Sequence, residues 1–413
     1  MTKVNPFKPN SPVPTAMFAG RTNEIQAFEK GLMQTKNNNP THFLLTGERG
    51  IGKSSLLMLF KPMATGAITS YHFGSFKFLS ANIVVSPKMN LLTIIKMIER
   101  NLKREIGKVE SLRNFFSDSW DFVQRIKVLD SGIDKVKEIE DIDLVIDDFS
   151  YSLAETSLRL SNPNKGETAK DGIVIFIDEA DNSSPELQLG YFLKTVTEQL
   201  QINGCDNVMF VVAGLPVVID KLTESHESSL RIFHPMQIKE LSPPDRQYVI
   251  DKGMEEANRN GESKITIAAS AKQHISTLSE GYPHFIQQFA YCAFDANDDG
   301  EISDDDVLKG AFTEGGAIDC IGTRYYAAQY HAQIKSDEYR EVLCIMADNM
   351  NSWVKKSDIR SEFSGSDQTL NNAIQALTKR KIILKNTSKI GEYRLQQRGF
   401  ALWIKLFGQR TTK

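Results

Sequence analysis

Continuous apolar runs alternate with amphipathic segments along the first part of the chain. HFLL, GIVIFI and NVMFVV are unbroken apolar runs, which is the pattern of strands buried on both faces of a parallel sheet. Segments between them, such as MNLLTIIKMIERNLKREI, carry apolar residues every three to four positions and predict amphipathic helices. Alternation of this kind predicts an α/β domain built on a parallel sheet over residues 17–240.

Two segments do not follow this alternation. Residues 1–16 predict an extended arm with little capacity for helix, because they contain Pro6, Pro9, Pro12 and Pro14. Residues 103–170 predict an insertion in the α/β domain, with a helix at SLRNFFSDSWDFVQRI and a loop at SNPNKGETAKDG.

Beyond the α/β domain the pattern changes twice. Residues 241–324 predict a helical lid, and residues 325–413 predict a separate small domain. In the latter, DEYREVLCIMAD, KKSDIRSEF and SDQTLNNAIQALTKR read as three short helices. The strands KIILKN and GEYRL follow around the turn TSKIG, so we expect a winged helix with a two-stranded wing.

Composition is that of a globular protein in several domains. The chain has 413 residues, of which 41% are apolar and 24% are charged. Its four cysteines are far apart and form no C-x-x-C pair, which favours buried thiols in a reducing compartment. The N-terminus lacks the apolar core of a signal peptide, and no apolar run reaches membrane-spanning length. We therefore expect a cytoplasmic protein that does not enter a membrane.

Charge is distributed unevenly along the chain. The net charge is −3, but residues 355–413 contain 13 Lys and Arg against four Asp and Glu, a net charge of +9. This basic domain predicts double-stranded DNA as a partner. Outward-facing residues of its third helix suit base edges and phosphates: Gln368, Thr369, Asn371, Asn372, Gln375, Lys379 and Arg380. The alternative is a winged helix used only for packing or oligomerisation.

The stretch TGERGIGKSSLL predicts a phosphate-binding loop between a strand and a helix. It fits G-x-x-x-x-G-K-[ST] through Gly47, Gly52, Lys53 and Ser54. Glycines let backbone N–H groups approach phosphate oxygens, and the helix that follows directs its positive dipole end at them. Lys53 should reach the β- and γ-phosphates, and Ser54 should bind Mg²⁺. The expected nucleotide contacts in this loop are Gly47, Glu48, Arg49, Gly50, Ile51, Gly52, Lys53, Ser54 and Ser55.

Two carboxylates at the end of another buried strand complete the predicted site. In GIVIFIDEAD, Asp178 and Glu179 follow the apolar run, at the sheet edge where ligands of α/β proteins bind. Asp178 should hold Mg²⁺ through water, and Glu179 should polarise the attacking water.

These two motifs are the Walker A and Walker B motifs, and the chain resembles the AAA+ and STAND ATPases, in particular their origin-recognition-like members. In FAGRTNEIQAFEKGL, the residues Phe18, Gly20, Arg21 and Glu24 match the F-x-G-R-x-x-E turn that lies against the adenine in these families. An ordinary amphipathic helix would explain the apolar positions of this segment as well. The resemblance implies a P-loop NTPase core with a helical lid and a C-terminal winged helix, binding ATP and Mg²⁺.

Other segments match the family in part. NVMFVVAGLP resembles the strand that carries sensor 1, but AGLP stands where the family usually has Asn, Thr or Ser. Arg231 falls where such families carry an arginine for the γ-phosphate, often of a neighbouring subunit; the alternative is a surface arginine. In the lid, Gly281 and Pro283 match a G-x-P helix, and the resemblance makes Pro283 an expected nucleotide contact. His284 and Gln287 stand near the usual place of the sensor 2 arginine.

The acidic segment DANDDGEISDDD raises the question of calcium. Asp295, Asn297, Asp299, Gly300, Ile302 and Asp306 match positions of a calcium-binding loop between two helices. The candidate calcium ligands are Asp295, Asn297, Asp299, Glu301 and Asp306. The alternative is an acidic turn of structural origin, since the loop ends in Asp rather than the usual Glu.

Three functions follow from these patterns. The first is an assembly or switch ATPase that acts on DNA, with Arg231 of a neighbouring copy completing the site. The second is a STAND-type signalling switch with a protein partner. The third is a nucleotide-locked scaffold that binds ATP and turns it over little.

Overall fold

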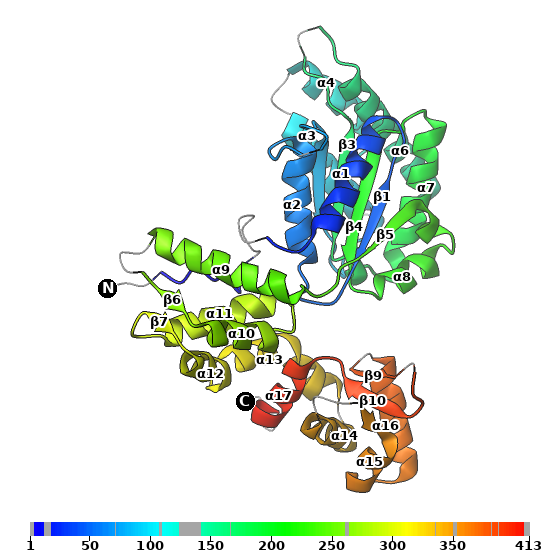
Figure 1. Ribbon diagram of the computed structural model, residues 1–413. Coiled ribbons are helices and arrows are strands. Elements are labelled where there is room, and N and C mark those ends of the chain that lie inside the picture. Colours follow the sequence, from blue (N-terminus) through cyan, green and yellow to red (C-terminus); the bar gives the residue numbers. More distant parts are fainter. Residues whose placement is uncertain are drawn as a thin grey trace, which may run out of the picture. The chain divides into compact units, whose positions relative to one another are not determined.

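A computed structural model describes residues 4–11, 18–70, 72–106, 110–123, 142–165, 167–260, 264–334, 336–349, 353–380, 382–386 and 388–408 (Figure 1). Residues 1–3 and 12–16 of the predicted arm, 124–141 of the predicted insertion and 409–413 of the predicted winged helix lie outside the described residues. The chain divides into two compact units. One unit is residues 21–239, and the other combines residues 1–20 with residues 240–413.

The first unit is built on a five-stranded parallel sheet with helices on both faces (Figure 1). Its strands are β1 (His42–Thr46), β2 (Leu79–Val84), β3 (Ile173–Asp178), β4 (Val208–Gly214) and β5 (Phe233–Gln237). They are ordered β2-β3-β4-β1-β5, and every neighbouring pair is parallel. The central strand β4 is buried over its whole length, as its unbroken apolar run predicts.

Helices cover this sheet and form its insertion. They are α1 (Thr22–Lys36), α2 (Lys53–Thr65), α3 (Leu91–Ile106), α4 (Glu110–Ser119), α6 (Ile142–Ser161), α7 (Leu189–Ile202) and α8 (Val218–Ser225). Short 3₁₀ turns are η2 (Ala180–Asn182), η3 (Pro185–Leu187) and η4 (Ser229–Ile232). Within the insertion, the Trp120 ring stacks on Phe116, and its Nε1 donates to Thr156 Oγ1 on α6 over 2.9 Å. The insertion therefore shares the hydrophobic core of the sheet.

Strand order explains how two distant motifs meet. All five strands are parallel, so their carboxyl ends lie at one edge of the sheet. The phosphate loop follows β1, the Asp178–Glu179 pair stands at the end of β3, and β4 lies between these two strands. The ends of three adjacent strands thus supply the candidate site.

The second unit begins with the predicted lid. Its elements are α9 (Pro243–Asn260), β6 (Thr266–Ile267), α10 (Ala269–Leu278), α11 (Pro283–Ala296), β7 (Glu301–Ile302), α12 (Asp304–Phe312), α13 (Ala317–Tyr325) and the π-helical η5 (Ala328–Gln333). The arm packs on this helical region: Phe7 is 2% exposed and contacts Phe294, and Arg324 donates to the carbonyl oxygen of Pro9. A Cβ at Gly253 would lie only 2.2 Å from the Phe7 ring, so a glycine is required there.

The rest of this unit contains the three helices and two strands expected of a winged helix, together with two further elements. It consists of α14 (Asp337–Asp348), β8 (Val354–Lys355), α15 (Lys356–Glu362), α16 (Asp367–Lys379), β9 (Ile383–Lys385), β10 (Glu392–Leu395) and α17 (Arg398–Phe407). The expected two-stranded wing is a three-stranded sheet ordered β8-β10-β9. Helix α17 packs on α13 and α14, and Trp403 fits against Gly322, where a Cβ would lie 1.7 Å from the indole.

No helix among the described residues has the length and apolarity needed to cross a membrane.

Candidate nucleotide-binding site

The phosphate loop has the backbone that its glycines predict. Strand β1 ends at Thr46, and Gly50 and Gly52 adopt φ angles of 79° and 98°, in the left-handed region that favours glycine. Helix α2 then begins at Lys53. No side chain caps this helix and no acidic residue lies in its first turn, so its N–H groups remain open to an anion.

Lys53 is anchored to the loop that it follows. Its Nζ donates hydrogen bonds to the carbonyl oxygens of Gly47 (2.8 Å) and Glu48 (3.0 Å). Burial lowers the pKa of Lys53, and the nearby carboxylates of Asp181 and Asp178 oppose that shift. The lysine is therefore preorganised beside the loop, with the carboxylates that follow β3 close enough to act on its charge.

Arg21 is hydrogen-bonded to the backbone of the phosphate loop. Its side chain is 5% exposed, and Nη2 donates to the carbonyl oxygen of Ile51 over 3.0 Å. Glu24 lies 3.7 Å from the same guanidinium. The resemblance places this segment against the adenine; the described contacts join Arg21 to the phosphate loop, and its contact with the adenine stays a prediction.

The other residues expected to contact the nucleotide lie in the second unit. Phe18 is half-buried, Gly20 has a φ of 67°, and Pro283 is the first residue of α11. A Cβ at Gly20 would lie 2.6 Å from Asp245. Their contacts with the nucleotide stay predictions.

Asp178 is the last residue of β3 and Glu179 follows it, as the sequence predicts. Asp178 Oδ1 accepts a hydrogen bond from the Glu179 N–H over 2.8 Å. Glu179 is exposed, and its φ of 54° is unusual for a residue with a side chain. Asn182 Nδ2 donates to Glu179 Oε2 (3.0 Å) and to the carbonyl oxygen of Val85 (3.2 Å), the residue after β2.

Two residues of this loop could not be singled out from the sequence. Asn182 holds the Glu179 carboxylate, and Asp181 Oδ1 accepts from the Leu215 N–H over 2.9 Å. In the sequence, these two polar residues stand in the segment ADN directly after the Walker B pair. Nothing in that segment indicates that Asp181 would accept a hydrogen bond from Leu215.

The donor set fits Mg²⁺ and a nucleotide triphosphate. Ser54 is exposed in the first turn of α2, and Asp178 is half-buried at the end of β3. A hydroxyl and a carboxylate are hard oxygen ligands, and Mg²⁺ keeps few protein ligands because it retains waters and phosphate oxygens. Glu48 is half-buried, Arg49 is exposed and Ser55 is half-buried along the same loop.

Three further positions, namely Arg231, the end of β4 and His284, were considered for a role in catalysis from the resemblance. Arg231 is exposed in η4, and no ion pair involves it among the described residues. Strand β4 ends at Gly214, followed by Leu215, so its end offers no polar side chain. His284 is not placed as a catalyst: burial lowers its pKa to about 4, and its Nε2 lies 2.6 Å from Arg324 Nη1.

The acidic loop of the second unit is closed by an amide rather than arranged around a cation. Asn297 is 1% exposed, and its Nδ2 donates to Asp299 Oδ1 (2.8 Å), the Glu301 carbonyl oxygen (3.0 Å) and Asp306 Oδ2 (3.3 Å). Asp306 Oδ2 also accepts a hydrogen bond from the backbone N–H of Ser303, the N-cap residue of α12. Across the described ranges, no three His, Cys, Asp or Glu side chains form a metal-binding group. The geometry favours the acidic turn over the predicted calcium loop.

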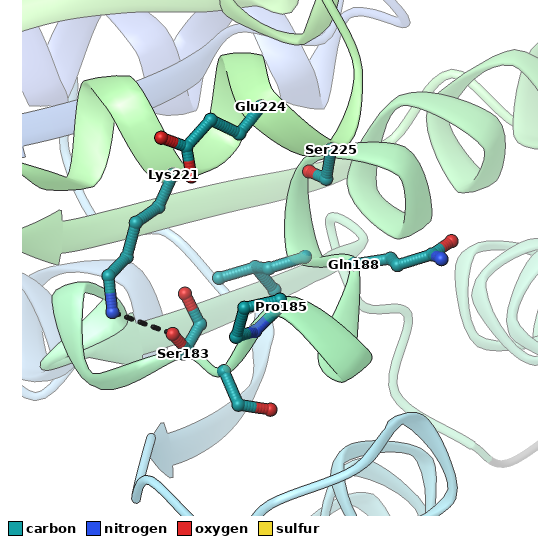
Figure 2. Close-up of a pocket in the computed structure, with 8 residues that line it drawn as sticks. Ser183, Pro185, Gln188, Lys221, Glu224 and Ser225 are labelled. Atoms are coloured by element: carbon teal, nitrogen blue, oxygen red, sulfur yellow. Dashed lines mark hydrogen bonds between the residues drawn. The ribbon is translucent and has the colours of Figure 1, made fainter.

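A pocket lies beside the candidate site, between η3 and α8. It has a volume of about 230 Å³ and is lined by Ser183, Ser184, Pro185, Gln188, Leu189, Lys221, Glu224 and Ser225. Figure 2 shows the Lys221 side chain extending to Ser183, where Nζ donates to the carbonyl oxygen over 2.7 Å. None of these lining residues is a predicted nucleotide ligand.

No family model and no curated protein matches the chain. Solved structures do match it. The Aeropyrum pernix ORC2 protein in ADPNP–ADP complexes is 12% identical with a TM-score of 0.55, over 98% of this chain and 97% of that chain. The ADP form of that protein is 13% identical with a TM-score of 0.50, over 97% and 98% of the two chains. CDC6P from Pyrobaculum aerophilum is 13% identical with a TM-score of 0.46, over 97% of each chain.

The likeness to ORC2 extends over nearly the whole of both chains, and at this identity it concerns the fold. The expected α/β class is confirmed by the five-stranded parallel sheet and its order. The chain therefore has the same overall fold as the Aeropyrum pernix ORC2 protein.

Proposed function

We propose that this protein is an ATP-binding and ATP-hydrolysing AAA+ ATPase that acts on double-stranded DNA through its winged-helix domain. The observation that carries the first half is the uncapped N-terminus of α2, with Lys53 anchored beside it. An open helix N-terminus with a lysine and left-handed glycines is an anion site specific for phosphate. Hydrolysis also requires carboxylates for the metal and the attacking water, and Asp178 and Glu179 stand at the same edge of the sheet.

Each residue has a distinct task in this proposal. The N–H groups of the loop and the Lys53 ammonium bind the β- and γ-phosphates. Ser54 and Asp178 would hold Mg²⁺, which supplies charge neutralisation at the phosphates when bound. Glu179 orients and polarises the attacking water, and its exposed carboxylate is restrained by Asn182.

The DNA-binding half rests on the surface of α16. Gln368, Asn371, Asn372 and Gln375 are exposed, and Thr369 is half-buried. The opposite face is buried through Leu370, Ile374 and Leu377, so the amide side chains form one outward face. Lys379 and Arg380 are exposed where the helix ends. Amides that can pair with base edges, followed by cations for phosphates, are the chemistry of DNA readout.

One experiment separates the candidate functions. ATP turnover is measured with and without duplex DNA, and the molecular mass is measured in parallel. The proposal predicts turnover that rises when duplex DNA is added. Turnover that ignores DNA would indicate the switch with a protein partner, and tight ATP binding with almost no turnover would indicate the nucleotide-locked scaffold.

A charge-reversal variant tests the DNA surface itself. Removing one cation that binds a DNA phosphate should reduce the slope of log affinity against log salt by about 0.9. Reversing both Lys379 and Arg380 to Glu should therefore flatten the salt dependence and weaken binding to all sequences alike. Asn372→Ala should instead alter sequence preference with little change in slope. If the double variant binds duplex DNA with wild-type affinity at every salt concentration, the DNA-binding surface lies elsewhere or does not exist.

A further inference from the structure

The end of β4 carries no polar side chain. The strand ends at Gly214, and Leu215 follows it. What the strand end does present is the N–H of Leu215, which donates to Asp181 Oδ1 over 2.9 Å. The polar contact at this point is therefore made from the neighbouring loop.

Asp181 and Gly214 are closely fitted. A Cβ at Gly214 would lie 3.0 Å from Asp181 Oδ1 and 3.1 Å from the Asp181 backbone nitrogen. Gly214 is buried, so a side chain here would force its neighbours to shift by a few tenths of an ångström. The loop after β3 therefore packs directly on the backbone at the end of β4.

The loop that carries Glu179 is held from both neighbouring strands. Asp181 joins it to the end of β4, and Asn182 joins it to Val85 after β2. Farther along, Lys221 Nζ on α8 donates to the carbonyl oxygen of Ser183 (Figure 2). The Asp181 carboxylate is also close enough to Lys53 to oppose the effect of burial on its pKa.

We propose that Asp181 is a positioning residue for ATP hydrolysis: by accepting the Leu215 N–H, it fixes the end of β4 against the loop of Glu179 and supplies the polar contact that β4 itself lacks. This inference rests on the proposed ATPase function. The Asp181 side chain acts as a hydrogen-bond acceptor. A neutral side chain that keeps an acceptor oxygen at this position should therefore preserve the contact with the Leu215 N–H.

The test compares two substitutions at one position. Asp181→Asn keeps an acceptor oxygen for the Leu215 N–H, while Asp181→Ala removes it. If this hydrogen bond holds the catalytic geometry, Asp181→Ala should lower kcat roughly tenfold to hundredfold. Asp181→Asn should stay within about threefold of wild type, and both variants should bind a labelled ATP analogue with wild-type affinity.

Two further variants guard the result. Asp220→Ala removes an exposed carboxylate on α8, whose side chain makes no described hydrogen bond, and should leave kcat unchanged. Gly214→Ala disturbs the same contact from the side of β4 and should lower kcat as Asp181→Ala does. Melting temperatures measured in parallel report folding.

The outcomes are distinct. Wild-type kcat in Asp181→Ala overturns the inference, and so does an equal loss in Asp181→Asn, because charge rather than the hydrogen bond would then matter. A loss of analogue affinity equal to the loss of kcat would make Asp181 merely structural and overturns it too. Failure of the proposed function appears separately, as absence of turnover in the wild type, and the inference falls with it.

Discussion

The side-chain amide of Asn182 donates a hydrogen bond to Oε2 of Glu179 over 3.0 Å. Glu179 has a left-handed backbone, with a φ of 54°, at the point where β3 gives way to η2. This backbone lets the chain turn directly after the strand, and the amide then fixes the direction of the exposed carboxylate. The candidate catalytic group is thus restrained before any nucleotide binds.

Glu179→Gln tests the assigned catalytic role. The amide keeps an oxygen that Asn182 can reach, but it is a far weaker base than the carboxylate that should polarise water. Binding of a labelled ATP analogue should be unchanged, and turnover should fall by about 10²–10⁴-fold, the usual range for general base catalysis. Phosphate release measured at saturating ATP reads the effect. Turnover at the wild-type rate would remove Glu179 from the mechanism.

Arg231→Ala tests action across an interface between copies. The side chain is exposed and makes no ion pair among the described residues, as expected of an arginine that serves a neighbouring site. Loss of an arginine that stabilises the transferred phosphoryl group costs about 10³-fold or more in turnover. Mixing this variant with Lys53→Ala should restore part of the activity, because one interface would then combine an intact loop with an intact arginine. Without such rescue, Arg231 acts within its own chain or not at all.

Asn297→Ala tests the acidic loop. Removing the buried amide would leave the acceptors Asp299 and Asp306 without its N–H groups, so the free energy of unfolding should fall by about 1–3 kcal/mol. Millimolar calcium should leave the melting temperature of the wild type unchanged, since Asn297 donates toward the oxygens that a cation would need. A calcium-dependent rise that disappears in Asp295→Ala would reinstate the calcium loop.

His42 should make the protein sensitive to acid. It is 4% exposed on β1, its Nδ1 accepts from the Phe210 N–H over 3.0 Å, and burial lowers its pKa from 6.5 to about 4. Between these values the unfolded chain binds a proton that the folded chain does not. The free energy of unfolding therefore falls as pH drops from 6.5 toward 4, by about 3 kcal/mol for this group, and is flat above 6.5.

His42→Asn isolates this contribution. The Asn oxygen can replace Nδ1 as the acceptor but does not titrate, so urea unfolding of the variant should lose less stability between pH 7 and pH 4.5 than the wild type. Equal losses would mean that His42 titrates normally in the folded protein.

Spacing within short segments was enough to predict much of this molecule. The turn between β1 and α2 was predicted from Gly47, Gly52, Lys53 and Ser54, the residues that a phosphate-binding turn requires at this spacing. Helix α16 follows from Leu370, Ile374 and Leu377, which are all buried. In both cases the physical requirement lies within one turn or one helix, and a local pattern records it.

Contacts between distant segments left no such record. Trp403 fits because Gly322 has no Cβ, Phe7 fits because Gly253 has none, and Arg21 donates to the carbonyl oxygen of Ile51. Strand β8 has two residues, too few to show a period. The Asp181–Leu215 contact joins two loops whose proximity depends on the order of the strands in the sheet.

The most direct measurement is equilibrium binding of a labelled ATP analogue to the wild type, Lys53→Ala and Lys61→Ala in the presence of Mg²⁺. Lys53 is the cation expected to face the phosphates, whereas Lys61 is a half-buried lysine of the same helix that lies outside the loop. The wild type and Lys61→Ala should bind with equal affinity, and Lys53→Ala should lose binding. Wild-type affinity in Lys53→Ala would contradict the assignment of this loop as the nucleotide site.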